Sequence, residues 1–315
     1  MEVEKLMFDE LDDQNKELDL EGGLAQFAQV YMPARNFAAR TRQEYQSDLS
    51  DLAAFLKERR ILSWAVVGLR DLQHFMAELD RRKLAPSSRN RKTYAIKTFF
   101  GFLHQSGYIR TNPAGELIPP TIPQKERRFL REEEYQALLA QAHESRDRAI
   151  LEVFLQTGLR LTELTQLCLS DLELPRRITK DPENVGFLKV RRKRGKEVLL
   201  PLNWKACEAL AAWVAERTQI LGRDSTEQAI FISKFKKAMT PRAIRFLVEK
   251  YMDRADIEGA SVHTLRHTMA THYLAKGGDL KSVQEMLGHE SLETTQIYLG
   301  LAKKMQRRMV QELAL

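Results

Sequence analysis

The sequence predicts a mainly α-helical protein with two domains, the second of which also carries a small β-sheet. Apolar residues recur mostly at the spacing of one helix face. Four prolines fall between residues 112 and 127, and because proline interrupts a helix, this stretch predicts an extended linker. Residues 186–190 and 197–202 have the pattern of two strands joined by a basic turn. At 315 residues, the chain is long enough to bury two cores.

The domain boundaries follow from the linker and from the composition of the N-terminus. We expect an acidic leader at 1–21, a first domain at 22–110, a linker at 111–127 and a second domain at 128–315. The first domain is predicted to be a bundle of four helices. They are expected at 24–32, 39–60 and 67–82, and from a cap at Ser87-Ser88 to Gly107.

The fourth helix carries an apolar stripe and, near its start, a basic face. The basic face consists of Arg89, Arg91, Lys92 and Lys97. Because the N–H groups at a helix N-terminus also favour phosphate, this face predicts contact with a nucleic-acid backbone. The alternative is an ordinary solvated surface.

The second domain is expected to be mostly helical. Its helices are predicted at 131–142, 146–156, 204–221, 242–253, 263–276 and 280–287, and a further short helix is expected over LTELTQL, residues 161–167. Gly158 suits a left-handed stop after the second of these helices. Thr240 and Pro241 give a cap and a first helical position for the fourth. A short helix capped by Ser291 is expected to carry Tyr298, and an amphipathic tail follows it.

The charge distribution suggests a polyanionic partner. The formal net charge is +7, and residues 1–21 hold nine Asp and Glu against two Lys. The remainder holds 48 Lys and Arg against 34 Asp and Glu, a net charge of +14. Such an excess favours nucleic acid as a partner, although a basic protein with solvated faces has the same composition.

Other compositional features exclude several classes of protein. No apolar run approaches the roughly 18 residues of a transmembrane helix, and the acidic N-terminus differs from a signal peptide. We therefore expect a cytoplasmic protein with no membrane partner. Cys168 and Cys207 are the two cysteines, and both lie in apolar segments, so we expect buried thiols and no disulfide.

Several side chains suit chemistry on a phosphodiester. Its cleavage needs a nucleophile, charge stabilisation on the non-bridging oxygens and a proton for the leaving alkoxide. His263, Arg266, His289 and Tyr298 lie close together near the C-terminus. Since a guanidinium donates two hydrogen bonds at once, Arg160 is a candidate to act with Arg266. Taken singly, such arginines are more often surface residues and such a tyrosine is more often a core residue.

The turn between the two strands, RRKRGK, offers a further candidate. Lys193 lies in this turn, from which it can reach into a groove and donate a proton. Alternatively, the turn contacts only backbone phosphates, together with Arg191, Arg192 and Arg194.

His263 and His267 form an H-x-x-x-H pair of the kind found in zinc sites on helices. Thr264 stands where the glutamate of H-E-x-x-H would be, and no nearby Asp or Glu completes a site. We therefore expect no metal and no other cofactor. His267 and His272 are interpreted as hydrogen-bonded structural histidines.

In combination, four motifs resemble those of a known family. They are TGLRLTEL around Arg160, KRGKEVLLPL around Lys193, HTLRHTMATHYL at His263 and Arg266, and LGHESLETTQIYL at His289 and Tyr298. Their order and intervals are similar to those of the tyrosine recombinases, or phage-type integrases, and most of all the Xer-type recombinases. The resemblance is strong over 128–315 and weaker over 22–110. Because the turn has Arg194-Gly195 where a Gly-first turn is common, Lys196 is the alternative to Lys193.

The resemblance implies a site-specific DNA recombinase. Its N-terminal domain would be a four-helix core-binding domain of the SAM-like type, followed by the catalytic domain. Tyr298 would attack the scissile phosphate and form a 3′-phosphotyrosyl link. Arg160 and Arg266 would bind the phosphate, and Glu163 would support Arg160. Lys193 would protonate the leaving 5′ oxygen. His263 would act as acid and base toward the tyrosine, and His289 would donate a hydrogen bond to the phosphate.

The resemblance also implies partners. These are double-stranded DNA and a tetramer on two DNA sites, formed by one recombinase or with a second one. The tail after Tyr298 would dock on a neighbouring protomer or, alternatively, pack on its own domain. Chromosome or plasmid resolution and mobile-element integration or excision are both open, and the expected location is the nucleoid. The rival functions are a catalytically inactive DNA-binding regulator on the same scaffold and a type IB topoisomerase.

Overall fold

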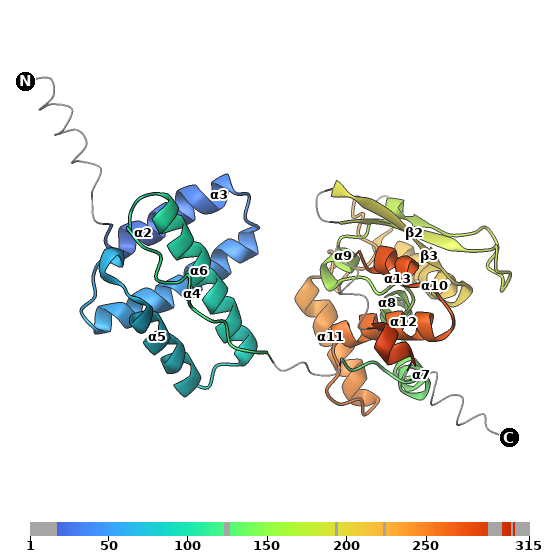
Figure 1. The fold of residues 1–315 in the computed structure, drawn as a ribbon. Helices are drawn as coiled ribbons and strands as arrows, with labels where there is room; N and C mark the ends of the chain where they lie inside the picture. The colour runs from blue at the N-terminus through green and yellow to red at the C-terminus, as the bar shows by residue number, and fades with distance from the viewer. Residues whose placement is uncertain are drawn as a thin grey trace, which may run out of the picture. The chain divides into compact units, whose positions relative to one another are not determined.

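The computed structural model describes residues 18–122, 127–192, 195–222, 225–288, 298–303 and 305. The chain divides into two units, Met1–Lys125 and Glu126–Leu315 (Figure 1). Both are mostly helical, and the second carries one three-stranded antiparallel sheet among its described residues, which confirms the predicted fold class. Within the described ranges, no helix has the length and apolar character needed to cross a bilayer.

The first unit is a helical bundle built around aromatic side chains. Its elements are α2 (Leu20–Gln26), η1 (Phe27–Tyr31), α3 (Met32–Ala34), α4 (Ala39–Glu58), η2 (Trp64–Val66), α5 (Leu69–Arg81) and α6 (Pro86–Gln105). The ring centroid of Phe99 on α6 lies 5.2 Å from that of Phe27 and 4.7 Å from that of Trp64. Trp64 Nε1 also donates a hydrogen bond of 3.1 Å to the carbonyl of Leu20, which ties η2 to the start of α2.

The start of α6 differs from the prediction. The helix begins at Pro86, and its N-cap, Ala85, makes no side-chain hydrogen bond. Proline has no N–H that needs a partner at the first helical position, and its φ is already helical. The helix therefore starts earlier than a Ser87-Ser88 cap would allow, and no capping hydroxyl is needed.

In the second unit, helices pack around α8 and beside the sheet. Its elements are α7 (Glu132–Ala140), α8 (Ser145–Thr157), α9 (Leu161–Thr165), η3 (Leu169–Asp171), β1 (Leu172–Glu173), β2 (Gly186–Arg191), β3 (Glu197–Leu202), α10 (Trp204–Leu221), α11 (Pro241–Arg254), α12 (Val262–Ala275) and α13 (Leu280–Leu287). The strand order is β1-β2-β3, with β2 antiparallel to both neighbours. Leu188 faces Leu200 in the register and both are buried, so this side of the hairpin contributes to the core.

Several local predictions for the second unit are confirmed. Gly158 adopts φ +61° at the end of α8, and α10 occupies the predicted residues. Thr240 Oγ1 accepts the N–H of Ala243 at 3.2 Å, and Pro241 opens α11. Both cysteines are free thiols, but Cys207 is buried whereas Cys168 is only partly buried. Strand β1 was not predicted, because two residues are too few to show an alternating pattern.

Candidate active site

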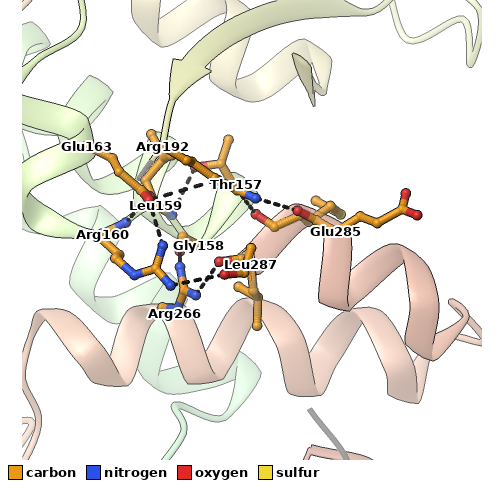
Figure 2. Close-up of polar contacts among 11 residues, drawn as sticks. Thr157, Gly158, Leu159, Arg160, Glu163, Arg192, Arg266, Glu285 and Leu287 are labelled. Carbon is orange, nitrogen blue, oxygen red and sulfur yellow. Dashed lines mark hydrogen bonds and ion pairs between the residues drawn. The ribbon is translucent and has the colours of Figure 1, made fainter. Parts of the chain in front are cut away.

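The turn after α8 brings distant parts of the second unit together. Gly158 has a left-handed backbone, and a Cβ added to it would lie 2.5 Å from Cε of Met269 on α12. Glycine is therefore required both by the backbone conformation and by the close approach of α12. The turn leads into Arg160, the N-cap residue of α9, which thus lies near Arg266 of α12 (Figure 2).

Arg160 is held by a carboxylate in the first turn of α9. Its backbone N–H donates to Glu163 Oε2 at 2.8 Å, and its Nη1 donates to Oε1 at 2.7 Å. One side chain thus caps the helix and orients the guanidinium, in line with the supporting role that the resemblance implied for Glu163. Nη2 donates to the carbonyl of Gly288 at 3.2 Å, and 40% of the side chain is exposed. Arg160 is therefore oriented by protein groups and still accessible to a ligand.

Arg266 is buried and held by backbone carbonyls. Its Nη1 donates to the carbonyl of Gly158 and its Nη2 to that of Leu287, both at 2.6 Å. Burial, and then the charge of Arg160, lower the pKa of the Arg266 guanidinium to about 10, so it stays protonated at neutral pH. Two guanidiniums from distant parts of the chain thus contribute positive charge to one site.

A third arginine reaches the same helix end. Arg192 donates from Nη1 to the carbonyl of Glu285 at 2.6 Å and from Nη2 to that of Met286 (Figure 2). The next two carbonyls along the chain are those bound by Arg266 and Arg160. A helix leaves its last carbonyls without partners from the next turn, and its dipole favours cations there. We call the carbonyls of residues 285–288 the α13 carbonyl end.

The side chain of Arg192, which the sequence predicted to contact DNA, is largely buried against α13. Its side chain is 7% exposed, and its Nε lies 3.9 Å from Oε1 of Glu163. Burial is the main cause that lowers the pKa of Arg192. Arg191, the residue before it, is exposed and lies within 3.5 Å of both Asp171 and Glu197. Neighbours in sequence therefore differ in environment, because the end of β2 lies beside α13.

His263 lies in the first turn of α12 and is exposed. Its pKa is lowered first by partial desolvation and then by the charge of Arg266. The charges of Arg245 on α11 and of Arg160 lower this pKa further. His263 is thus neutral near pH 7 and can accept a proton. Among the described residues, no group of three or more His, Cys, Asp and Glu could hold a metal ion.

Tyr298 is buried beside Arg266. Its exposure is 0%, and it packs in an apolar cluster with side chains of α12 and α13. Burial raises the pKa of the phenol, whereas the charges of Arg266 and then Arg127 lower it. Nδ1 of His267 lies 2.7 Å from the Tyr298 Oη. The predicted nucleophile is therefore close to a phosphate-binding candidate and in hydrogen-bond contact with a histidine.

His267 is hydrogen-bonded, as interpreted from the sequence, but its partner Tyr298 was not predicted. The two residues are 31 positions apart, so helical periodicity gave no signal for their meeting. His272, by contrast, is structural as expected. Its Nε2 lies 2.8 Å from the carbonyl of Leu130, and its ring lies edge-on to that of Tyr135.

Some predicted site residues lie outside the described residues. They are Lys193 and Arg194 of the β2–β3 turn, His289, and the tail from 306 onward. Lys196, the alternative to Lys193, is described and exposed. Its carbonyl accepts the N–H of Arg192 at 2.8 Å, which closes the turn at this end.

The basic face predicted on α6 is in part an internal ion-pair network. Lys92 is buried, and its Nζ lies 3.0 Å from Oδ1 of Asp48 and 3.0 Å from Oδ2 of Asp51. Arg91 Nη1 lies 2.5 Å from the other oxygen of Asp48. Burial raises the pKa of Asp48, although both cations oppose this. Lys92 is thus not on an exposed face, because α4 presents carboxylates to this side of α6.

The two remaining cations of this face also have partners within the first unit. Arg89 Nη1 lies 2.6 Å from Oδ1 of Asp80 on α5. Lys97 Nζ donates to the carbonyls of Gly115 and Leu117 at 2.8 and 2.9 Å. Arg89, Arg91 and Lys97 are each half-buried and keep some surface toward solvent.

Comparisons with known proteins match most of the chain. The model of the phage integrase family matches residues 128–305, and that of the phage integrase N-terminal SAM-like domain matches residues 24–107. Tyrosine recombinase XerC of Pelotomaculum thermopropionicum is 33% identical over 84% of this chain and 88% of that protein. Tyrosine recombinase XerC of Pseudomonas aeruginosa is 35% identical over 85% of this chain and 86% of that protein.

Solved structures agree with this fold. A lambda integrase dimer bound to a COC′ core site has a TM-score of 0.71 at 17% identity, over 93% of this chain and 80% of that one. XerH recombinase in a post-cleavage complex with a palindromic difH substrate has a TM-score of 0.70 at 21% identity, over 91% and 84%. At these identities, the likeness shows the fold.

The fold and the family matches together define an enzyme of site-specific DNA recombination. The first unit has the SAM-like fold of the family's N-terminal domain, and the second carries the integrase domain. The chain belongs to the phage integrase family, and within it to the tyrosine recombinases.

Proposed function

We propose that this recombinase cuts and rejoins DNA strands through a covalent 3′-phosphotyrosyl intermediate on Tyr298. The observation that carries the proposal is the convergence of Arg160 and Arg266 on one positive site beside the phenol. Guanidinium forks match the non-bridging oxygens of a phosphodiester in both charge and geometry. The phenol supplies the oxygen nucleophile that such a site needs.

In this mechanism, the Tyr298 oxygen attacks the scissile phosphorus and the bond to the 5′ oxygen breaks. Arg160 and Arg266 bind the non-bridging oxygens, on which negative charge increases during the attack. Lys193 is proposed to protonate the leaving 5′ oxygen, and His289 to hydrogen-bond the phosphate. The covalent link conserves the energy of the broken bond, so rejoining to a partner strand needs neither ATP nor a metal ion.

His263 is proposed to take part in proton transfer at the same phosphate. Its lowered pKa supports this role, because the neutral imidazole near pH 7 can accept a proton. Its exposure supports the role as well, since a bound DNA strand can approach it from solvent. DNA contacts outside the active site are proposed for the half-buried Arg89, Arg91 and Lys97 of α6, for Arg191 and, from the sequence, for Arg194.

The assembly and the biological role are proposed from the relatives. Lambda integrase has been solved as a tetramer bound to a Holliday junction. We propose a tetramer on two DNA sites for this chain, formed with its own copies or with a second recombinase, in which the tail after Tyr298 docks on a neighbour. Similarity to XerC over most of the chain favours chromosome or plasmid resolution, at the nucleoid, over integration or excision of a mobile element.

The covalent intermediate can be tested by trapping. Genomic fragments that the chain binds would first be selected and sequenced to find its site. A duplex with this site and a nick beside the cleavage position releases a short strand on cleavage, so the covalent complex accumulates. We expect the wild-type chain to form a complex that survives denaturation. Tyr298→Phe should bind the same duplex with unchanged affinity and form none.

Either of two outcomes would contradict the proposal. Covalent complexes formed by Tyr298→Phe would show that another residue is the nucleophile. A wild-type chain that binds its selected site tightly but never becomes covalently attached would instead favour the rival function, a DNA-binding regulator on a recombinase scaffold.

A further inference from the structure

Strand β2 directs Arg192 toward the interior of the second unit. Successive residues of a strand alternate between its two faces, and Leu188 and Val190 are both buried. Arg192 follows in the same phase, and its backbone N–H donates to the carbonyl of Lys196 at 2.8 Å, so the pairing with β3 continues to this residue. For this reason its side chain is only 7% exposed, although it stands at the start of a basic turn.

The guanidinium of Arg192 ends on the last turn of α13. Its Nη1 donates to the carbonyl of Glu285 at 2.6 Å, and its Nη2 donates to that of Met286. Two hydrogen bonds from one planar group fix both its position and its plane. Gly288 leaves room for this approach, because a Cβ added to it would lie 2.8 Å from Cζ of Arg192. The contact thus ties one end of the β2–β3 turn to α13.

The two phosphate-binding arginines have further supports that do not involve Arg192. Arg160 is held by two hydrogen bonds to Glu163 in addition to the carbonyl of Gly288. Arg266 is held by the carbonyl of Gly158 in addition to that of Leu287. Loss of the Arg192 side chain should therefore disturb the start of the turn more than it disturbs these two guanidiniums.

Lys193, the proposed general acid, directly follows Arg192 in the sequence. Consecutive Cα atoms are about 3.8 Å apart, so the place of Arg192 limits where the lysine side chain begins. A general acid must come within hydrogen-bond distance of the oxygen that it protonates. Because a lysine side chain is long and flexible, its accuracy depends on how firmly its backbone is held.

We propose that Arg192 is a positioning residue that anchors the turn of the general acid to α13, so that Lys193 protonates the leaving 5′ oxygen. In that step the bond from the Tyr298 oxygen to phosphorus forms and the bond from phosphorus to the 5′ oxygen breaks. The 5′ oxygen takes a proton from the lysine ammonium, which becomes a neutral amine and regains the proton on rejoining. Arg192 itself contacts no reacting atom. This inference rests on the proposed covalent mechanism.

The test measures single-turnover formation of the covalent complex on two nicked duplexes that differ in one atom. One has the natural 5′ oxygen at the cleavage position, and the other has sulfur there. A thiol is far more acidic than an alcohol, so the thiolate leaves without a proton and needs no general acid. Lys193→Ala gives the pattern for loss of the acid, and Arg160→Lys gives the pattern for damaged phosphate binding. Lys189→Met, which removes a cation of the same strand, is the matched control.

We expect Arg192→Met to slow the reaction of the oxygen substrate by about 100-fold and that of the sulfur substrate by less than about threefold. Lys193→Ala should likewise be slow with oxygen alone, whereas Arg160→Lys should be slow with both substrates. Arg192→Lys keeps the charge but cannot bond two carbonyls with one planar group, so we expect it to be slower by about tenfold with oxygen and normal with sulfur. Lys189→Met should match the wild type on both.

Three results would overturn the inference. If Arg192→Met is slow with both substrates, Arg192 supports phosphate binding and not the general acid. If it cleaves the oxygen substrate at the wild-type rate, the anchor is not needed. If sulfur does not restore Lys193→Ala, the lysine is not the general acid and Arg192 cannot act through it. Should Arg192→Met fail to fold, as judged by its melting temperature, Arg192→Lys is assessed by the same ratio of rates. Failure of the covalent mechanism is distinct, because the wild-type chain would then form no complex on either duplex.

Discussion

Two groups of cations in this chain are held by different partners. On α6, Arg89, Arg91 and Lys92 each pair with an aspartate of α4 or α5. In the second unit, Arg160, Arg192 and Arg266 each donate to the α13 carbonyl end. Arg160 is also paired with Glu163, and Arg266 also donates to the carbonyl of Gly158. A carboxylate cancels the charge of the cation that it pairs with, whereas a carbonyl satisfies the N–H groups and leaves most of that charge in place.

The difference shows which group is suited to hold a phosphate. The three cations of α6 face three carboxylates, so that cluster is close to neutral. In the second unit, Arg160 and Arg192 both lie near one carboxylate, that of Glu163, at 2.7 and 3.9 Å. Helix carbonyls therefore fix the arginines in place while the site keeps an excess of positive charge. The number of cations in the sequence alone would not have distinguished these two groups as phosphate-binding candidates.

The largest effect is expected where a carbonyl-held cation is removed. Arg192→Met leaves two carbonyls of α13 without their guanidinium and takes one positive charge from the site. Because small displacements of catalytic groups are costly, we expect covalent trapping to slow by about 100-fold. Lys205→Met, which removes an exposed cation of the same unit, is the control. Equal trapping rates in both variants would show that the α13 carbonyl end does not position the site.

A smaller effect, on stability and not on chemistry, is expected for the carboxylate-paired group. Lys92→Met leaves Asp48 buried with Arg91 as its remaining cation. We expect the free energy of unfolding of the first unit to fall by about 3 kcal/mol, measured by denaturant titration of the full chain. The exposed pair of Arg40 and Glu44 gives the control, since Arg40→Met should leave the free energy of unfolding nearly unchanged.

The Lys92 prediction also tests the comparison itself. Removal of a buried, carboxylate-paired lysine should leave the rate of trapping per folded molecule unchanged. If Lys92→Met instead keeps its stability but loses DNA affinity, Lys92 contacts DNA after all, and the contrast between the two groups is wrong.

The smallest effect is a pH dependence at His263. Its pKa in the folded chain lies below the ordinary value of 6.5, through partial desolvation and the charges of Arg266, Arg245 and Arg160. Protonation of His263 is therefore easier in the unfolded chain than in the folded one. The free energy of unfolding is not reduced by His263 above pH 6.5, and it falls as the pH drops from 6.5 through the lower pKa of the folded chain. The melting temperature of the wild type should decline slightly more on acidification than that of His263→Asn. Identical declines would argue against a positive field at His263.

Features that depend on a few adjacent residues were predictable from the sequence. The left-handed Gly158, the cap at Thr240, the β2–β3 hairpin and the span of α10 all follow from local conformational preferences. Even there, a strong signal was overridden at α6, where Pro86 starts the helix before the serines. Glu163 was predicted to support Arg160, and the two lie within the same helical turn.

The sequence by itself determined the kinds of side chain available: the arginines, the histidines of α12 and the tyrosine near the C-terminus. The tertiary structure decided which of them meet. Arg192 reaches a carbonyl 93 residues away, and His267 reaches a phenol 31 residues away. The physical reason is that a charge or a proton acceptor acts over a few ångströms, and which groups come that close is set by how the helices pack.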